Sequence, residues 1–143
     1  SKTYGINTAS LRYFNIFGER QKISGTYAAV VGIFMKQFKN NMNLTVRGDG
    51  KQSRDFIYVG DIVSANIKAM ESNKELNGDV YNIGSGKQMT ILDLAKIFNK
   101  KISFVNSVQE IYSSQADISK AINELNWKPT IDIKDWIEKN IIL

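Results

Sequence analysis

Two residue types are missing from this sequence, and each absence excludes a class of chemistry. None of the 143 residues is a cysteine, so disulfides, thiolate nucleophiles and cysteine-bound iron–sulfur clusters are excluded. None is a histidine, which excludes His-based acid–base catalysis, Ser-His-Asp triads and most zinc sites. We therefore expect no metal site.

Long apolar runs are missing as well. No stretch approaches the length of a transmembrane helix, and no signal-peptide pattern opens the chain. We expect a cytoplasmic protein with no membrane partner. The composition, 43% hydrophobic and 23% charged, is that of an ordinary globular domain.

The net charge of +5 at pH 7 suits an anionic partner, such as a nucleic acid or a phosphorylated small molecule. The charges are dispersed, however, and their densest cluster, at Lys96, Lys100 and Lys101, is typical of a solvated face. No nucleic-acid-binding motif with interleaved aromatic residues accompanies them. Nucleic acid is therefore not the expected partner, although steep salt dependence of DNA binding would revive that hypothesis.

The apolar periodicity predicts alternating strands and helices, and hence an α/β or α+β fold. Strands are expected over residues 7–16, 44–47, 55–59, 79–83 and 102–105, and helices over 27–40, 61–70, from 90, from 117 and after 132. The strands at 44–47 and 55–59 flank the turn Gly48-Asp49-Gly50, which favours a hairpin.

Helix-start signals mark two of the expected helices. Asp61 is expected to be the N-cap of the second helix. Its inward face would hold Ile62, Val63, Ile67 and Met70. Thr90 and Asp93 form a capping box at the start of another helix. That helix is expected to bury Ile91, Leu94, Ala95 and Phe98.

Four segments, in order, resemble signatures of one family. They are residues 11–21 (LRYFNIFGERQ), 48–61 (GDGKQSRDFIYVGD), 80–86 (VYNIGSG) and 116–121 (ADISKA) followed by Trp127-Lys128-Pro129. Together they span nearly the whole chain and resemble the extended short-chain dehydrogenase/reductases, with UDP-sugar 4-epimerases as the most similar branch. The resemblance implies the last strand of a Rossmann-type sheet over residues 1–20, followed by a substrate-binding domain over residues 21–143.

The resemblance also implies an NAD-dependent, homodimeric parent whose two chemical elements are absent here. One is the glycine-rich turn that meets the NAD pyrophosphate, and the other is a Tyr-x-x-x-Lys pair that carries the acid–base chemistry. Lys2 stands too close to Tyr4 and Gly5 to be the motif lysine. We expect the chain to begin after the catalytic helix, to hold no catalytic residue, and to be inactive and free of NAD by itself.

Two residues of the first strand match ligand positions of the family. By resemblance, Tyr13 faces the nicotinamide, although a core strand aromatic is the alternative. Asn15 corresponds to an amide that contacts the diphosphate side of the nucleotide-sugar, and a turn asparagine is its alternative.

Two further positions would act through their backbone. The helix start at Ala29 and Val30 offers bare N–H groups that correspond to diphosphate donors in relatives, although every helix has such an end. The strand holding Thr45 and Arg47 matches one whose main chain contacts uracil, much as an edge strand pairs with another strand.

Arg54 is the sharpest candidate, because a fixed guanidinium can form two-pronged bonds to phosphate. A local ion pair with Asp55 is the alternative. By resemblance, Glu110 accepts from the ribose hydroxyls, while Ser107 stands where relatives have a second phosphate-binding arginine. Either Lys100, Lys101 or Arg20 substitutes for it, or diphosphate affinity is reduced.

Three functions remain open on these grounds. The first is the UDP-sugar-binding part of an NAD-dependent 4-epimerase. The others are a stand-alone, non-catalytic UDP-sugar-binding module and a fragment of a nucleotide-sugar dehydratase or reductase. The apolar first strand also predicts self-association of the chain, because its edges and faces would be exposed.

Overall fold

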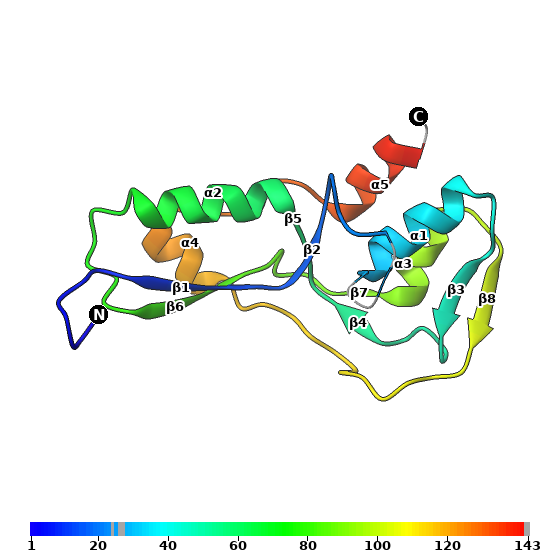
Figure 1. Ribbon diagram of the computed structural model, residues 1–143, viewed down its shortest axis with the longest axis horizontal. Helices are drawn as coiled ribbons and strands as arrows, with labels where there is room; N and C mark the ends of the chain where they lie inside the picture. Colours follow the sequence, from blue (N-terminus) through cyan, green and yellow to red (C-terminus); the bar gives the residue numbers. More distant parts are fainter. Residues whose placement is uncertain (24, 26–27, 142–143) are drawn as a thin grey trace.

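The computed structural model describes residues 1–23, 25 and 28–141, which form an elongated α/β structure (Figure 1). Its elements are, in order, β1 (Ala9–Tyr13), β2 (Asn15–Phe17), α1 (Val30–Lys39), β3 (Leu44–Arg47), β4 (Ser53–Arg54), β5 (Phe56–Tyr58), α2 (Val59–Met70), β6 (Asp79–Ile83), β7 (Met89–Thr90), α3 (Ile91–Ile97), β8 (Ile102–Val105), α4 (Ser119–Leu125) and α5 (Ile133–Ile141). The mixed α/β class, with parallel strand pairs, agrees with the expected fold.

The single strand expected over residues 7–16 divides in two at Phe14. β1 pairs in parallel with β6, whereas β2 pairs in parallel with β5. The Phe14 N–H still donates to the Ile83 carbonyl (3.0 Å), and the next N–H, of Asn15, already donates to the Asp55 carbonyl (3.1 Å). Asn15 therefore lies where the chain changes partner strands, next to Arg54 and Asp55.

The predicted hairpin is wrong. β3 pairs in parallel with β8, β4 pairs antiparallel with β7, and β5 pairs with β2. After the glycine turn, the carbonyls of Gly50 and Gln52 accept from the N–H groups of Leu92 and Ile91. The start of α3 thus satisfies the backbone that a hairpin partner would otherwise have bonded, and this carries β4 away from β3.

The protein has two hydrophobic clusters. The helices and strands that carry most of each cluster lie toward opposite ends of the molecule, with α1, α3 and β3 at one end and α2, α4 and β6 at the other (Figure 1). One is formed by β3 and by α1, α3 and α5, and it includes Phe17, Phe34, Leu94 and Ile137. The other is formed by β6, α2 and α4, and it includes Ile57, Tyr81, Leu125 and Trp127, with Ala9 and Leu11 of β1 against it. Both clusters draw on segments before and after residue 20, so the expected division there stays a prediction about a longer protein.

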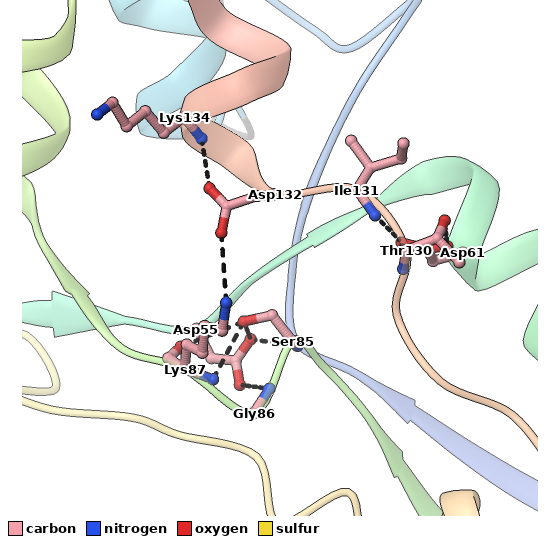
Figure 2. A network of polar contacts seen from close by, with 9 residues as sticks. All are labelled: Asp55, Asp61, Ser85, Gly86, Lys87, Thr130, Ile131, Asp132 and Lys134. Atoms are coloured by element: carbon pink, nitrogen blue, oxygen red, sulfur yellow. Dashed lines mark hydrogen bonds and ion pairs between the residues drawn. The ribbon is translucent and has the colours of Figure 1, made fainter.

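The expected role of Asp61 is wrong, and so is much of the expected inward face of α2. The N-cap is Tyr58, and Asp61 is a buried residue of the first turn. Its carboxylate accepts from the N–H and hydroxyl of Thr130 and from the Ile131 N–H, which ties α2 to the segment before α5 (Figure 2). Of the predicted inward residues only Ile62 is buried. The other three are exposed: Val63 (54%), Ile67 (46%) and Met70 (85%).

The cap predicted at Thr90 of α3 is confirmed, whereas Asp93 bonds back to the Thr90 hydroxyl, where a capping box uses the N-cap backbone N–H. The Thr90 hydroxyl oxygen accepts from the Asp93 N–H at 3.0 Å and donates to the Asp93 carboxylate at 2.7 Å. All four residues that this helix was expected to bury are buried. For the helix expected over 27–40, the observed bounds are Val30–Lys39, and Tyr27 lies outside the described residues.

Candidate functional site

Two hollows meet at one ion pair. The first, of about 250 Å³, is lined by Arg54, Phe56, Lys87, Met89 and Asp132 among others, and is called the Arg54 hollow. The second, of about 320 Å³, is lined by Arg47, Gln52, Ser107, Glu110 and Tyr112 among others, and is called the Arg47 hollow. Arg54 and Glu110 line different hollows and bond to each other, so their ion pair lies at the boundary.

Arg54 is held firmly at both ends of its guanidinium. Its backbone belongs to β4, opposite Met89 of β7. Nη1 donates to the Ser53 carbonyl at 2.8 Å, and Nη2 donates to Oε2 of Glu110 at 2.5 Å. The two side chains are 14% and 35% exposed, so the pair is partly screened from water.

Asp55 points away from Arg54 and is fully buried, so the local ion pair considered above is wrong. Its carboxylate accepts from the N–H (2.6 Å) and hydroxyl (2.7 Å) of Ser85 and from the Gly86 N–H (3.0 Å) (Figure 2). It also accepts from the Ala116 N–H (3.0 Å). Adjacent strand residues face opposite sides, which sends Arg54 to the hollows and Asp55 into the interior. Asp55 thereby fixes the 85–86 loop and the segment after Glu110 to β5.

Gln52 joins two of the predicted ligand residues, although sequence reasoning did not single it out. Its Nε2 donates to the Arg47 carbonyl (3.1 Å) and to Oε1 of Glu110 (3.3 Å). Gln52 is buried, so these bonds are sheltered. Its position two residues before Arg54, on the same side of an extended segment, was the available signal.

The segment that carries Glu110 lies along β4. The Ser53 N–H donates to the Tyr112 carbonyl (2.8 Å), and the Ser114 N–H donates to the Ser53 carbonyl (3.3 Å). Gln88 adds a side-chain bridge, because its Oε1 accepts from the hydroxyls of both Ser53 and Ser113. These bonds hold residues 110–116, called the 110–116 segment, against Arg54.

Asn15 and Tyr13 are positioned but do not line either hollow. The Asn15 Nδ2 donates to the Asp55 carbonyl at 2.8 Å, which ties β2 to the residue after Arg54. The Tyr13 hydroxyl donates to Oδ1 of Asn66 at 3.0 Å, and 44% of the residue is exposed. Tyr13 is thus not a core aromatic among the residues described.

Thr45 and Arg47 both face the open edge of β3. The N–H groups of Leu44 and Gly48 donate toward β8, so those of the alternate residues Thr45 and Arg47 point the other way. At Thr45 this edge is already bonded to Gln37. The Thr45 N–H donates to Oε1 of Gln37 at 3.1 Å, and the amide of Gln37 donates to the Thr45 hydroxyl at 3.0 Å. A base at this edge would have to share the Arg47 carbonyl with the Gln52 amide, and it would have to displace Gln37 at Thr45.

The start of α1 keeps the features of an anion site. Ala29 is the N-cap, makes no side-chain cap bond, and is followed by Val30 as the first helical residue. The first turn carries no acidic residue, so no carboxylate of that turn offsets the positive end of the helix dipole.

The three cations proposed to replace the arginine missing at Ser107 do not line either hollow. Lys100 instead donates to Oδ1 of Asn41 (2.6 Å) and lies over the Phe38 ring. Lys101 precedes β8, and Arg20 follows β2 with a φ of 62°. Besides Arg54 itself, the cation Lys87 lines the Arg54 hollow, and it pairs with Asp132 at 3.6 Å (Figure 2). It was missed, although it is the first cation after the Gly84-Ser85-Gly86 signature.

A separate polar cluster follows β2. The Tyr58 hydroxyl donates to Glu19 (2.9 Å), and the Trp136 indole N–H donates to its other oxygen (3.1 Å). The bond from Trp136, with that from Tyr58, lowers the pKa of the Glu19 carboxyl, while the bond to Glu19 raises the pKa of Tyr58. This cluster joins the loop after β2 to α5.

Among residues 1–23, 25 and 28–141, no group of three or more acidic side chains is placed to hold a metal ion. None of the helices described there has the length and apolar content needed to span a bilayer.

The family model for the NAD-dependent epimerase/dehydratase family matches residues 1–84. This chain belongs to that family. A Methanocaldococcus jannaschii protein described as a putative UDP-glucose 4-epimerase is 38% identical to this chain. The alignment covers 97% of this chain and 46% of that protein. The chain therefore spans about half the length of the relatives it matches.

Solved structures of the epimerase/dehydratase family agree. A UDP-glucose 4-epimerase from Thermotoga maritima, with UDP-glucose, is 30% identical with a TM-score of 0.89 and covers 99% of this chain and 47% of its own. A UDP-glucuronic acid 4-epimerase from Bacillus cereus, with UDP-glucuronic acid and NAD, is 33% identical with a TM-score of 0.87 over 99% of this chain and 46% of its own. NAD is thus a cofactor of the family, as the resemblance implied.

Proposed function

We propose that this chain is the nucleotide-sugar-binding part of an NAD-dependent UDP-sugar 4-epimerase. The observation that carries the proposal is a series of contacts that runs from Arg47 through Gln52 to Glu110 and Arg54, along two adjoining hollows. Taken in that order, they match a base, a ribose and a diphosphate along one extended ligand. The base lies at the open edge of β3, the ribose hydroxyls lie at Glu110, and the diphosphate lies in the Arg54 hollow.

The charges support this order. The Arg54 hollow is lined by two cations, Arg54 and Lys87, and by one carboxylate, that of Asp132, so the cations are in excess, which suits the anionic end of the ligand. The main-chain edge at Arg47 suits a base, because backbone N–H and C=O groups match the edge of a pyrimidine. The Arg47 carbonyl, which already accepts from Gln52, can accept a second bond. The N-terminus of α1, at Ala29 and Val30, and the amide of Asn15 are further proposed contacts on the diphosphate side.

The redox chemistry belongs to a longer protein. NAD supplies the hydride acceptor when it is bound, and it is held by an amino-terminal region with a glycine-rich turn. This chain contributes Tyr13, whose ring is exposed at the end of β1 and oriented by Asn66. A stand-alone UDP-sugar-binding module is the second candidate. The two are distinguished by whether the longer protein carries the glycine-rich turn and the Tyr-x-x-x-Lys pair.

The test compares Arg54→Ala with the unmutated protein. The affinities for UDP and for uridine are measured by calorimetric titration. The change should weaken UDP binding by about 1.5–3 kcal/mol, the range for a hydrogen bond to a charged group, because the guanidinium is the most buried cation of its hollow. Uridine, which lacks phosphates, should lose little. Arg54→Lys should rescue only partly, because an ammonium lacks the two-pronged geometry.

Arg12→Ala is the matched control, since it removes the same charge from an exposed β1 position outside both hollows. It should leave UDP affinity unchanged. Equal UDP affinity for the parent protein and Arg54→Ala would overturn the assignment of the diphosphate to Arg54.

A further inference from the structure

The Arg54–Glu110 ion pair stands across the path that the proposed ligand must take. Arg54 lines one hollow and Glu110 lines the other, and Nη2 of the first contacts Oε2 of the second. A ligand that fills only the Arg54 hollow can contact Arg54, but it leaves the Arg54–Glu110 ion pair in place beside it. A ligand that spans both hollows must contact both members of the pair.

A phosphate bound at Arg54 is brought close to a fixed negative charge. Two groups of the guanidinium, which has five N–H donors, already bond to Ser53 and Glu110. A phosphate that uses the rest lies near the Glu110 carboxylate, and like charges at short range in a partly buried site repel. Bare phosphates are therefore disfavoured here despite the two cations.

Glu110 has little freedom to move out of the way. Gln52 donates to its other oxygen, and the 110–116 segment is bonded to β4 through Ser53 and to β5 through Asp55. A carboxylate held in place can still be satisfied by new donors, because each oxygen accepts more than one bond. The two neighbouring hydroxyls of a ribose are such donors.

We propose that Glu110 is a specificity-determining residue that makes Arg54 accept a diphosphate only when the same ligand brings a vicinal diol to the carboxylate. The inference rests on the proposed function, and it adds a discrimination against free phosphates and pyrophosphate. The diol takes the carboxylate while the diphosphate takes the guanidinium, so one nucleoside diphosphate replaces both halves of the ion pair. Pyrophosphate can replace Glu110 as the partner of Arg54, but it offers the Glu110 carboxylate no donor and leaves that negative charge next to its own.

The experiment is Glu110→Gln, titrated separately with pyrophosphate, uridine and UDP. Glutamine keeps the shape and the bond to Gln52 but removes the charge. Pyrophosphate should bind about threefold to tenfold more tightly, because a partly exposed ion pair no longer competes for Arg54. Uridine should bind more weakly, because a charged acceptor for its diol is gone. The affinity ratio of pyrophosphate to uridine thus rises.

Asp79→Asn is the matched control. It removes the same charge from an ion pair, with Lys120 at 2.7 Å, that lies on β6 outside both hollows. It should leave both affinities unchanged, which would exclude a general effect of net charge. Glu110→Ala gives a second variant, and the shift in melting temperature produced by pyrophosphate should be larger in both Glu110 variants than in the parent protein.

An unchanged or lowered pyrophosphate affinity in Glu110→Gln, in protein whose UDP binding depends on Arg54, would overturn the role of Glu110 and leave the proposed function standing. A protein that binds UDP equally well with and without Arg54 would overturn the proposed function, and this inference with it.

Discussion

At the scale of single residues, the interior holds carboxylates that are satisfied by N–H and O–H donors instead of cations. Asp55 accepts four such bonds and Asp61 accepts three. A buried carboxylate is tolerated when donors replace its hydration shell. Each of the two carboxylates therefore links segments that are far apart in the sequence, and Asp55 does so directly after Arg54 in the chain.

Tyr81 makes a residue-scale prediction about pH. Burial, with the bond from its hydroxyl to Glu124 (2.8 Å), raises the pKa of Tyr81 to about 12. The unfolded chain ionises this hydroxyl near pH 10, so the stabilisation is fully present below about pH 10 and is lost as the pH rises toward about 12. Unfolding free energies measured in urea at about pH 8 and about pH 11.5 should fall by roughly 2 kcal/mol more in the parent protein than in Tyr81→Phe.

Tyr81→Phe is its own control, because every other titrating group is common to both proteins. At the lower pH it should be less stable by about 1 kcal/mol, the usual net contribution of one hydrogen bond. Parallel pH dependence in the two proteins would contradict the raised pKa.

The candidate site divides into residues that local sequence could identify and residues that it could not. The motif around Arg54 and the position of Glu110 were available from the sequence, and the structure brings these two residues into contact. Their mutual ion pair was not available, because it depends on the 110–116 segment lying along β4. Lys87 reaches its hollow for a similar reason, since β7 pairs with β4.

At the scale of elements, local signals predicted the elements but not their partners. The N-cap of α3 at Thr90 and the bounds of β6 and β8 follow from short stretches of sequence, and all are confirmed. Strand pairing was wrong at β3 because the partner, β8, lies far along the chain and nothing local distinguishes it from β5. The prediction of which α2 residues are buried was wrong, because periodicity shows that a stripe of the helix is apolar but does not show that other residues of this chain cover the stripe.

The apolar stripe of α2 predicts self-association of the 143-residue chain. Val63, Ile67 and Met70 recur at helical spacing and are all substantially exposed, beside the exposed Tyr13 of β1. Ile67→Lys should shift the protein toward monomer, because it places a charge in the middle of the stripe. Sedimentation velocity over a range of concentrations measures the change.

Asn123→Lys, on the exposed side of α4, adds the same charge away from the stripe and should have no such effect. If the unmutated 143-residue chain is monomeric at every concentration, the prediction that the α2 surface drives self-association is wrong.

At the scale of the whole molecule, the chain covers 46% of its relative from Methanocaldococcus jannaschii and 47% of the Thermotoga maritima epimerase. None of its six tyrosines is followed four residues later by a lysine, and none of its glycines forms the spacing of a dinucleotide turn. The proposed binding surface, by contrast, lies within the described residues: the Arg54 hollow, the Arg47 hollow and the ion pair at their boundary.

We therefore predict that the 143-residue chain neither binds NAD nor interconverts UDP-glucose and UDP-galactose. The measurement is a coupled assay of UDP-glucose formed from UDP-galactose and NAD, with protein purified from a host that lacks its own epimerase. Equilibrium dialysis against NAD gives the binding arm. Turnover above the buffer blank would show that catalytic groups lie within these residues after all.

While the chain is being synthesised, neither hydrophobic cluster can be completed until late. Ala9 pairs with Asp79 and Leu44 pairs with Ile102, so both halves of each sheet emerge far apart in time. Trp127 completes one cluster, and Ile133, Trp136 and Ile137 complete the other. Contacts over such separations carry a large loop-closure cost and form slowly. A nascent chain that has not passed residue 127 therefore exposes two unfinished cores, and these residues fold as a unit only after nearly all of them have left the ribosome.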